Sequence, residues 1–184
     1  MRINFLRNVL PGEQLEEKVC KNFTKEGLSV VQGEVYKAGS LTFLDTKGIY
    51  VPQENDLVII KIFYKCSEFY KCDLNGFIGV LPSLSFTNAT KRNKPELEVN
   101  DYIFAKVIKV GSEVLLSCNG DKLGKVEGYI ESFSPYQIRK LYLGLINEIG
   151  KRYKFKIFLG LNGKVCCVGE PAVISEVFKF IGEI

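Results

Sequence analysis

Hydrophobic residues near the start of the chain occur in short runs separated by turn-forming residues. Apolar positions lie between Ser29 and Tyr36 and again between Leu41 and Leu44, and glycines bracket both runs. Such short, interrupted runs are typical of β domains. Residues 1–53 are therefore predicted to form a small N-terminal β domain. Within it, the lysines of segment 18–25 fall near helical spacing, and this segment fits either a short helix or a loop.

The middle of the chain contains more strand candidates and two segments of similar sequence. Asn55-Asp56 precede an apolar run that ends at Lys61, and Asn100-Asp101 precede a similar run that ends at Lys106. Further strand candidates extend from Glu68 to Leu74, from Phe77 to Leu81 and from Glu113 to Cys118. Five short strands in about 65 residues are typical of an OB barrel. Residues 54–120 are therefore predicted to form a five-stranded OB barrel.

Residues 121–184 combine strand patterns with the clearest helix signals of the chain. A strand is expected over 125–130, and Ser134-Pro135 with Gln137 then form a capping-box signature. Apolar residues recur at three- and four-residue steps until Gly150, which is expected to end the helix. A second amphipathic helix begins at Pro171. With two intervening strands, the predicted order is β-α-β-β-α, and the fold class is mostly β with an α+β C-terminal module.

The tetrapeptide Gly160-Leu161-Asn162-Gly163 permits two interpretations. A GXXG that grips RNA in a KH domain joins two helices and clamps the nucleotide backbone. Here the flanking runs, 154–159 and 164–168, alternate or are β-branched as strands are, and Asn162-Gly163 tolerates the positive φ angles of a hairpin turn. The pattern favours a turn over an RNA clamp. Gly160, Asn162 and Gly163 are therefore predicted to be structural.

The amino-acid composition limits the kinds of functional site that the chain can form. The 184 residues include 25 basic and 21 acidic side chains, and the net charge of +4 permits only local contact with a polyanion. The chain has no histidine and its six cysteines lack metal-ligand spacing, so catalytic dyads with histidine and zinc sites are excluded. No glycine motif cradles a nucleotide phosphate. We expect no catalytic residue, metal, cofactor or small-molecule substrate. A metal-dependent nuclease relying on Asp101 or Glu131 is the enzymatic rival.

The chain carries no apolar run that approaches the roughly eighteen residues of a membrane span, and no secretory pattern at Met1. We therefore expect a soluble, intracellular, reduced protein that makes no membrane contact.

The densest group of positive charges is Lys91-Arg92-Asn93-Lys94, in the loop between the third and fourth barrel strands. Three cations and an amide suit the phosphates of RNA, although many charged loops are only solvated. Lys65 and Tyr70 complete the predicted RNA-binding set.

Aromatic residues gather on the first three barrel strands, where OB folds commonly stack bases. Strand alternation is expected to send Phe63 and Tyr64 to opposite faces, and likewise Phe69 and Tyr70. One member of each pair then belongs to the core, and the other is a candidate for stacking. The pattern itself does not choose between the faces.

Three stretches carry a resemblance to the cap subunits of the RNA exosome, specifically the ribosomal RNA-processing protein 40 family. They are residues 83–95, the end of the helix at 145–150, and Gly160-Leu161-Asn162-Gly163-Lys164. An N-terminal β module containing Val9-Leu10-Pro11-Gly12-Glu13, an S1 domain and a KH-like module follow in the order of that family. The resemblance implies an S1 domain at 54–120 and a KH-like domain at 121–184.

The same resemblance implies a function and partners. It implies a non-catalytic subunit that sits with other cap subunits on a ring of RNase PH-like proteins and guides single-stranded RNA into it for 3′-to-5′ processing. Lys91, Arg92 and Lys94 match the basic loop of the family, which contacts the RNA backbone. The resemblance also implies that the protein is found in the nucleus and nucleolus, and in the cytoplasm. The alternative is a free-standing S1-type RNA-binding or ribosome-associated factor.

Overall fold

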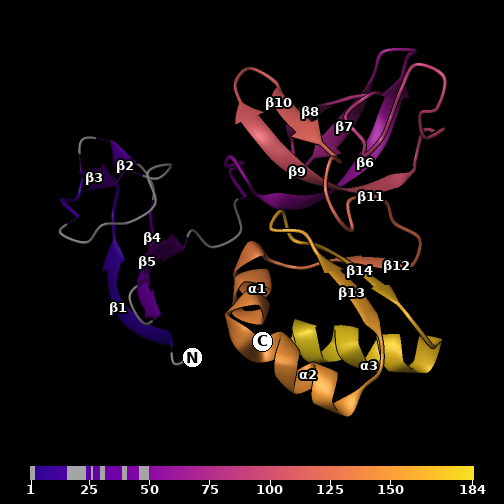
Figure 1. The fold of residues 1–184 in the computed structure, drawn as a ribbon. Coiled ribbons are helices and arrows are strands. Elements are labelled where there is room, and N and C mark those ends of the chain that lie inside the picture. Colours follow the sequence, from indigo (N-terminus) through magenta and orange to yellow (C-terminus); the bar gives the residue numbers. More distant parts are fainter. Residues whose placement is uncertain (1–2, 16–23, 26, 30–31, 39–40, 46–49) are drawn as a thin grey trace.

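The structure is a computed structural model that describes residues 3–15, 24–25, 27–29, 32–38, 41–45 and 50–184. It contains a small N-terminal sheet, a β-barrel, and a C-terminal sheet that lies between the barrel and a layer of helices (Figure 1). Among the described residues, no helix is long and apolar enough to cross a bilayer.

The N-terminal part is built from short strands. Strands β1 (Ile3–Val9), β4 (Gly33–Ala38) and β5 (Leu41–Asp45) form an antiparallel sheet in the order β1-β4-β5, and β2 (Thr24–Lys25) pairs with β3 (Leu28–Ser29). A small core of Val9, Leu15, Val35 and Leu44 lies against it. The predicted β character of this part is confirmed. The undecided segment 18–25 falls largely outside the described residues.

The predicted five-stranded barrel is confirmed. Its strands are β6 (Leu57–Lys65), β7 (Phe69–Leu74), β8 (Phe77–Pro82), β9 (Tyr102–Val110) and β10 (Val114–Ser117). Their order is β10-β8-β7-β6-β9, and pairing of β10 with β9 closes the barrel. The alternating side chains that point inward fill it, among them Ile60, Ile62 and Leu116.

The two segments of similar sequence form two structurally equivalent strands, β6 and β9. β6 and β9 show the same succession of buried and exposed positions over nine residues. Asn55 and Asn100 precede them with positive φ angles of 74° and 78°. Asp56 and Asp101 each accept a hydrogen bond from the amide three residues earlier, at 3.0 and 2.9 Å. Each Asn-Asp pair therefore makes a turn that feeds a strand, as predicted.

The C-terminal part has the predicted order β-α-β-β-α. Its elements are β12 (Tyr129–Ser132), α1 (Pro135–Lys140), the π-helical η2 (Leu141–Leu145), α2 (Ile146–Arg152), β13 (Lys156–Leu159), β14 (Lys164–Val168) and α3 (Pro171–Gly182). The sheet is antiparallel in the order β12-β14-β13. The capping box is present, because Gln137 N donates to Ser134 Oγ at 3.2 Å and Ser134 N donates to Gln137 Oε1 at 2.9 Å. The division of the chain at residues 53 and 120 stays a prediction.

The strand predicted over 125–130 is wrong in its extent. Strand β11 (Gly124–Lys125) pairs with β9 of the barrel, and β12 begins only at Tyr129. The chain crosses between the two sheets in between. At Gly128, a Cβ atom would lie 2.5 Å from the carbonyl oxygen of Cys167, so only glycine permits this close approach.

The prediction of one helix ending at Gly150 is also wrong. Gly144 has a φ of 125°, which interrupts the helix between α1 and α2. The second segment then continues through Gly150 to Arg152. A regular apolar period does not reveal such a break, because the buried positions stay on the same side of it.

Candidate nucleic-acid interface

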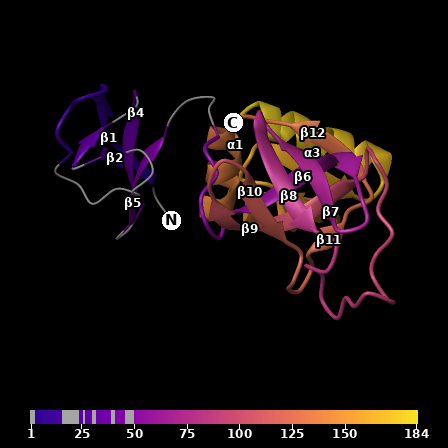
Figure 2. The ribbon, with the colours of Figure 1, turned by 90° about the horizontal axis from the view of Figure 1, so that it is seen from above.

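The basic loop between β8 and β9 projects from the barrel (Figure 2) and is anchored near both of its ends. At its start, Ser83 N donates to Glu68 O at 2.8 Å, and Cys118 N donates to Ser85 O at 2.7 Å. Near its end, Leu97 is buried in the barrel core. The loop is therefore positioned by its contacts with the barrel.

The tip of this loop presents its cations to solvent. Thr90 and Asn93 exchange two backbone hydrogen bonds, at 2.8 and 3.1 Å, which turn the chain at Lys91 and Arg92. The side chains of Lys91 and Arg92 are exposed, and neither forms an ion pair with a described residue. Asn93 is exposed as well. These side chains are available to phosphate oxygens without first giving up an internal ion pair.

Lys94 differs from its neighbours. It is half-buried, and its Nζ donates to the carbonyl oxygen of Ser67 at 2.6 Å. Ser67 lies in the turn between β6 and β7, so Lys94 fastens the basic loop to that turn. Its charge remains uncompensated by any carboxylate of the described residues.

Lys65 is less available than predicted. Its ammonium forms an ion pair with the carboxylate of Glu98, and the Glu98 hydrogen bond raises the pKa of Lys65. Both side chains are exposed, so the pair is open to solvent. An RNA phosphate would have to compete with Glu98 for this cation.

Tyr70 must be withdrawn as a base-stacking residue. Its side chain is 4% exposed and belongs to the barrel core, and its hydroxyl donates to Pro95 O at 3.3 Å. The ring is therefore closed to a nucleobase. Tyr70 instead ties the far end of the basic loop to β7.

The expectation that Phe63 and Tyr64 lie on opposite faces is also wrong. Both are half exposed, at 49% and 50%. The pairing of β6 with β7 shifts register between Ile62 and Tyr64, and such a bulge removes the strict alternation. Three consecutive exposed residues at the end of β6 are the result.

The aromatic pair that the structure brings to the surface is Tyr64 with Phe69. Their ring centroids lie 6.4 Å apart with planes tilted by 40°. The two residues flank the turn that holds Ser67, to which Lys94 is bonded. The exposed Tyr64 ring and the half-buried Phe69 ring thus flank a turn to which the basic loop is hydrogen-bonded, a combination that suits single-stranded RNA. The sequence named Tyr64 only as an alternative to Phe63, because the bulge that exposes both leaves no residue signature.

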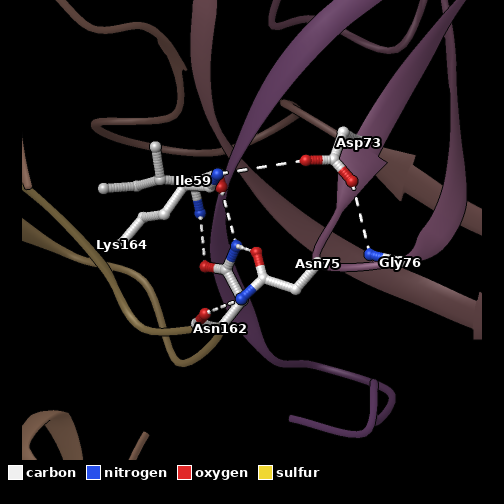
Figure 3. A network of polar contacts seen from close by, with 6 residues as sticks. All are labelled: Ile59, Asp73, Asn75, Gly76, Asn162 and Lys164. Atoms are coloured by element: carbon white, nitrogen blue, oxygen red, sulfur yellow. Dashed lines mark hydrogen bonds and ion pairs between the residues drawn. The ribbon is translucent and has the colours of Figure 1, made fainter. Parts of the chain in front are cut away.

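The Gly160-to-Gly163 turn is buried and serves another purpose. Gly163 has a φ of 90°, and its amide donates to Gly160 O at 2.9 Å, so the predicted hairpin turn is confirmed. Asn162 does not adopt a positive φ, contrary to expectation. Its side chain is fully buried: Ile59 N donates to Oδ1 at 3.1 Å, and Nδ2 donates to Ile59 O at 2.8 Å (Figure 3).

These bonds close an open edge of the barrel. Residues 57–60 of β6 pair with β9, while β7 joins β6 only from Lys61 onward. Leu161 N donates to Leu57 O at 2.8 Å, and Asn162 satisfies the amide and carbonyl of Ile59. The turn thus takes the place of a neighbouring strand.

The surroundings of this turn leave no room for a nucleotide backbone. A Cβ at Gly160 would lie 2.7 Å from Ile59 N. Asn75 Nδ2 donates to Asn162 O, and Lys164 Nζ lies 4.0 Å from a carboxylate oxygen of Asp73 (Figure 3). The amides of Gly160, Leu161 and Gly163 all have partners. The turn therefore joins the barrel to the C-terminal sheet, and its three amides are already used within the protein.

Of the two carboxylates in the nuclease hypothesis, Asp101 has structural partners, whereas Glu131 is exposed. Asp101 bonds Lys125 at 3.0 Å and the amide of Glu98 at 2.9 Å. Burial acts to raise the pKa of Asp101, but these two bonds hold it below its usual value. Among the described residues, no three metal-ligating side chains converge. The geometry thus offers a surface suited to RNA, and the described part brings together no cluster of carboxylates for a metal-dependent nuclease.

Comparison with known proteins agrees with this description. The model of the S1 domain of exosome complex component RRP40 matches residues 50–129. Exosome complex component rrp40 of Schizosaccharomyces pombe is 32% identical over 130 residues, which cover 63% of this chain and 54% of that protein. For human RRP40 the identity is 32% over 129 residues, with 63% of this chain and 47% of that protein covered. The chain thus spans about half the length of these relatives.

Two further similarities cover more of the chain. Exosome complex component Rrp4 of Aeropyrum pernix is 30% identical over an alignment 205 residues long, and the alignment covers 96% of this chain and 86% of that protein. A crystal structure assigned to an exosome complex RNA-binding protein has a TM-score of 0.63 and 27% identity, and the match covers 74% of this chain and 87% of that one. The similarity therefore extends beyond the barrel.

Proposed function

The chain belongs to the Rrp4/RRP40 family of exosome complex components, and from this premise we propose that it is a non-catalytic RNA-binding cap subunit of an exosome. In this role it guides single-stranded RNA into a ring of RNase PH-like subunits, alongside other cap subunits. The ring then carries RNA to an associated nuclease for 3′-to-5′ processing and degradation. We place this activity in the nucleus and nucleolus, and also in the cytoplasm.

One observation carries the RNA-binding part of the proposal. Lys91 and Arg92 are exposed and form no ion pair with a described residue, and they lie on a loop that Lys94 fastens to the turn between Tyr64 and Phe69. The cations neutralise phosphates, and the aromatic pair stacks a base without selecting its identity. Such sequence-tolerant binding suits a subunit that passes many RNAs. Because the same end of the barrel holds both features, one strand contacts both.

Salt dependence tests this surface. Single-stranded RNA gives a slope of log affinity against log salt of about 0.7 per phosphate neutralised. Replacing Lys91, Arg92 and Lys94 with alanine in the full chain should lower the slope for oligouridylate by about two. Lys37→Ala, Lys109→Ala and Lys179→Ala together make a matched control, since they remove the same charge from three exposed and separate positions. An equal change in both triple variants would contradict a localised RNA site.

Co-purification tests the assembly. A tagged copy of the chain, isolated gently from its own cells, should retain RNase PH-like subunits in stoichiometric amounts by mass spectrometry. Isolation alone or with ribosomes would instead support a free-standing or ribosome-associated RNA-binding factor. Incubating the pure chain with RNA and divalent cations should release no nucleotides. Release that Asp101→Asn abolishes would favour the nuclease.

A further inference from the structure

A second basic surface lies where α2 meets β13, at the end of the C-terminal part away from the barrel (Figure 1). Residues 151–156 read Lys-Arg-Tyr-Lys-Phe-Lys. Lys151, Arg152 and Lys154 are exposed and line a hollow of about 500 Å³. Neither the basic loop of the barrel nor the Gly160-to-Gly163 turn contributes to it.

The rest of the hollow is apolar. Ile146, Tyr153, Phe155 and Ile157 line it, and all four are half-buried and pack against the core between the helices and the sheet. From 153 to 157 the odd-numbered side chains turn toward this core, while Lys154 and Lys156 are exposed. The two-residue period therefore places aromatic rings within the hollow and a charge at its rim.

The cations of the rim have no carboxylate partners among the described residues. None of Lys151, Arg152 and Lys154 forms an ion pair there, although Glu148 lies in the same helix and Glu170 caps α3. On the barrel, by contrast, Lys65, Lys71 and Lys125 are each paired with a carboxylate.

The position of Lys151 and Arg152 in the last turn of α2 gives these two a structural role, because cations there complement the helix dipole. Lys154 follows the end of the helix, so this role does not account for it. A helix end also gives no account of the adjoining aromatic hollow. Cations around an apolar, nucleotide-sized hollow suit a ligand that is both anionic and aromatic.

We propose that this rim and hollow form a second site for single-stranded RNA, separate from the basic loop. Lys151, Arg152 and Lys154 neutralise phosphates, and one nucleobase enters the hollow against Tyr153 and Phe155. The inference rests on the proposed function, since it assumes that the chain handles RNA. It extends the path of the strand from the barrel to the far end of the C-terminal module.

The test uses the full chain and oligouridylate of about six nucleotides, within the site size of one OB fold. The oligonucleotide carries a photoreactive 4-thiouridine, and crosslinked peptides are mapped by mass spectrometry. We expect crosslinks at Tyr153 or Phe155 that persist in Lys91→Ala/Arg92→Ala. They should disappear in the triple variant K151A/R152A/K154A. In the Lys91→Ala/Arg92→Ala background, that triple change should lower the salt slope by about two.

The outcomes separate this inference from the proposed function. RNA binding that is lost entirely in Lys91→Ala/Arg92→Ala, with no crosslink between residues 151 and 157, would overturn the second site and leave the first. An absence of RNA binding by the unaltered chain would overturn both. If polyglutamate binds the K91A/R92A chain more tightly than oligouridylate, and K151A/R152A/K154A abolishes that binding, the surface takes an acidic protein and the RNA assignment fails.

Discussion

The basic loop and the Gly160-to-Gly163 turn both resemble RNA-binding motifs in sequence, yet their physical settings are opposite. Lys91 and Arg92 are exposed and have no ion-pair partner in the described part of the chain. Asn162 is fully buried, and both ends of its amide are hydrogen-bonded to the backbone of Ile59. Only the loop retains donors for a ligand.

This difference shows how a nucleic-acid motif becomes a structural one. A KH clamp needs amides and open space at its GXXG. Here the space is occupied by β6, and the amides of Gly160, Leu161 and Gly163 are used within the protein. The glycines are still required, Gly160 for close packing against the barrel and Gly163 for its positive φ and its approach to Phe133. The comparison therefore predicts that changes at the turn alter stability, whereas changes at the loop alter RNA binding.

The largest expected effect is that of Asn162→Ala. The change leaves the buried amide and carbonyl of Ile59 without partners, and each such loss is worth about 1–3 kcal/mol. We expect the free energy of unfolding to fall by about 3 kcal/mol in urea titration. RNA affinity per folded molecule should not change. Asn93→Ala is the control, since this asparagine is exposed on the loop and its loss should stay within about 0.5 kcal/mol.

A similar loss of stability in Asn93→Ala and Asn162→Ala would refute the contrast between the two regions. So would a change in the salt slope for RNA in Asn162→Ala under conditions in which the protein remains folded.

The second-largest expected effect is that of Tyr64→Ala, which tests whether changes near the basic loop alter RNA binding. Base stacking on one aromatic ring is worth about 1–3 kcal/mol, so Tyr64→Ala should weaken oligouridylate binding roughly tenfold. Because the side chain is half exposed, stability should change little. Phe77→Ala is the control: Phe77 is 40% exposed but begins β8, at the opposite end of the β7–β8 hairpin from Phe69. Fluorescence anisotropy measures the affinity of each variant for oligouridylate.

Equal weakening by Tyr64→Ala and Phe77→Ala would mean that exposed aromatic residues matter generally, and the stacking site would lose its location. No weakening by Tyr64→Ala would leave the phosphates as the sole contact.

Much of the fold followed from local patterns that the tertiary structure respects. The five barrel strands, the capping box at Ser134 and the hairpin after Leu159 all express short-range rules. The breaks did not. Gly144 interrupts a helix whose apolar period is regular, and the chain enters the C-terminal sheet at Gly128, where contact with Cys167 requires glycine. The crossing at Gly128 depends on a contact between segments far apart in sequence.

The candidate site divides in the same way. Exposure of the loop cations followed from their charge, since four consecutive polar residues cannot be buried. Which barrel aromatics reach the surface did not, because Tyr64 is exposed at a bulge in the pairing of β6 with β7, and Tyr70 takes an inward position of β7. Likewise, Glu98 lies 33 residues from Lys65 in sequence, so the ion pair that compensates Lys65 was invisible to any local pattern.

The smallest expected effect comes from that ion pair and moves in the opposite direction. Glu98→Gln removes the carboxylate that holds Lys65, so this cation becomes available to a phosphate beside the loop. We expect the salt slope for oligouridylate to increase by about 0.7, one phosphate more, with no measurable change in unfolding. Glu113→Gln is matched to it, because it removes the same charge and releases Lys71, whose Nζ lies 3.0 Å from Glu113. An equal increase in both variants would reflect net charge alone. An increase confined to Glu98→Gln would place Lys65 within the RNA surface and show that the protein itself limits how many of its cations RNA can use.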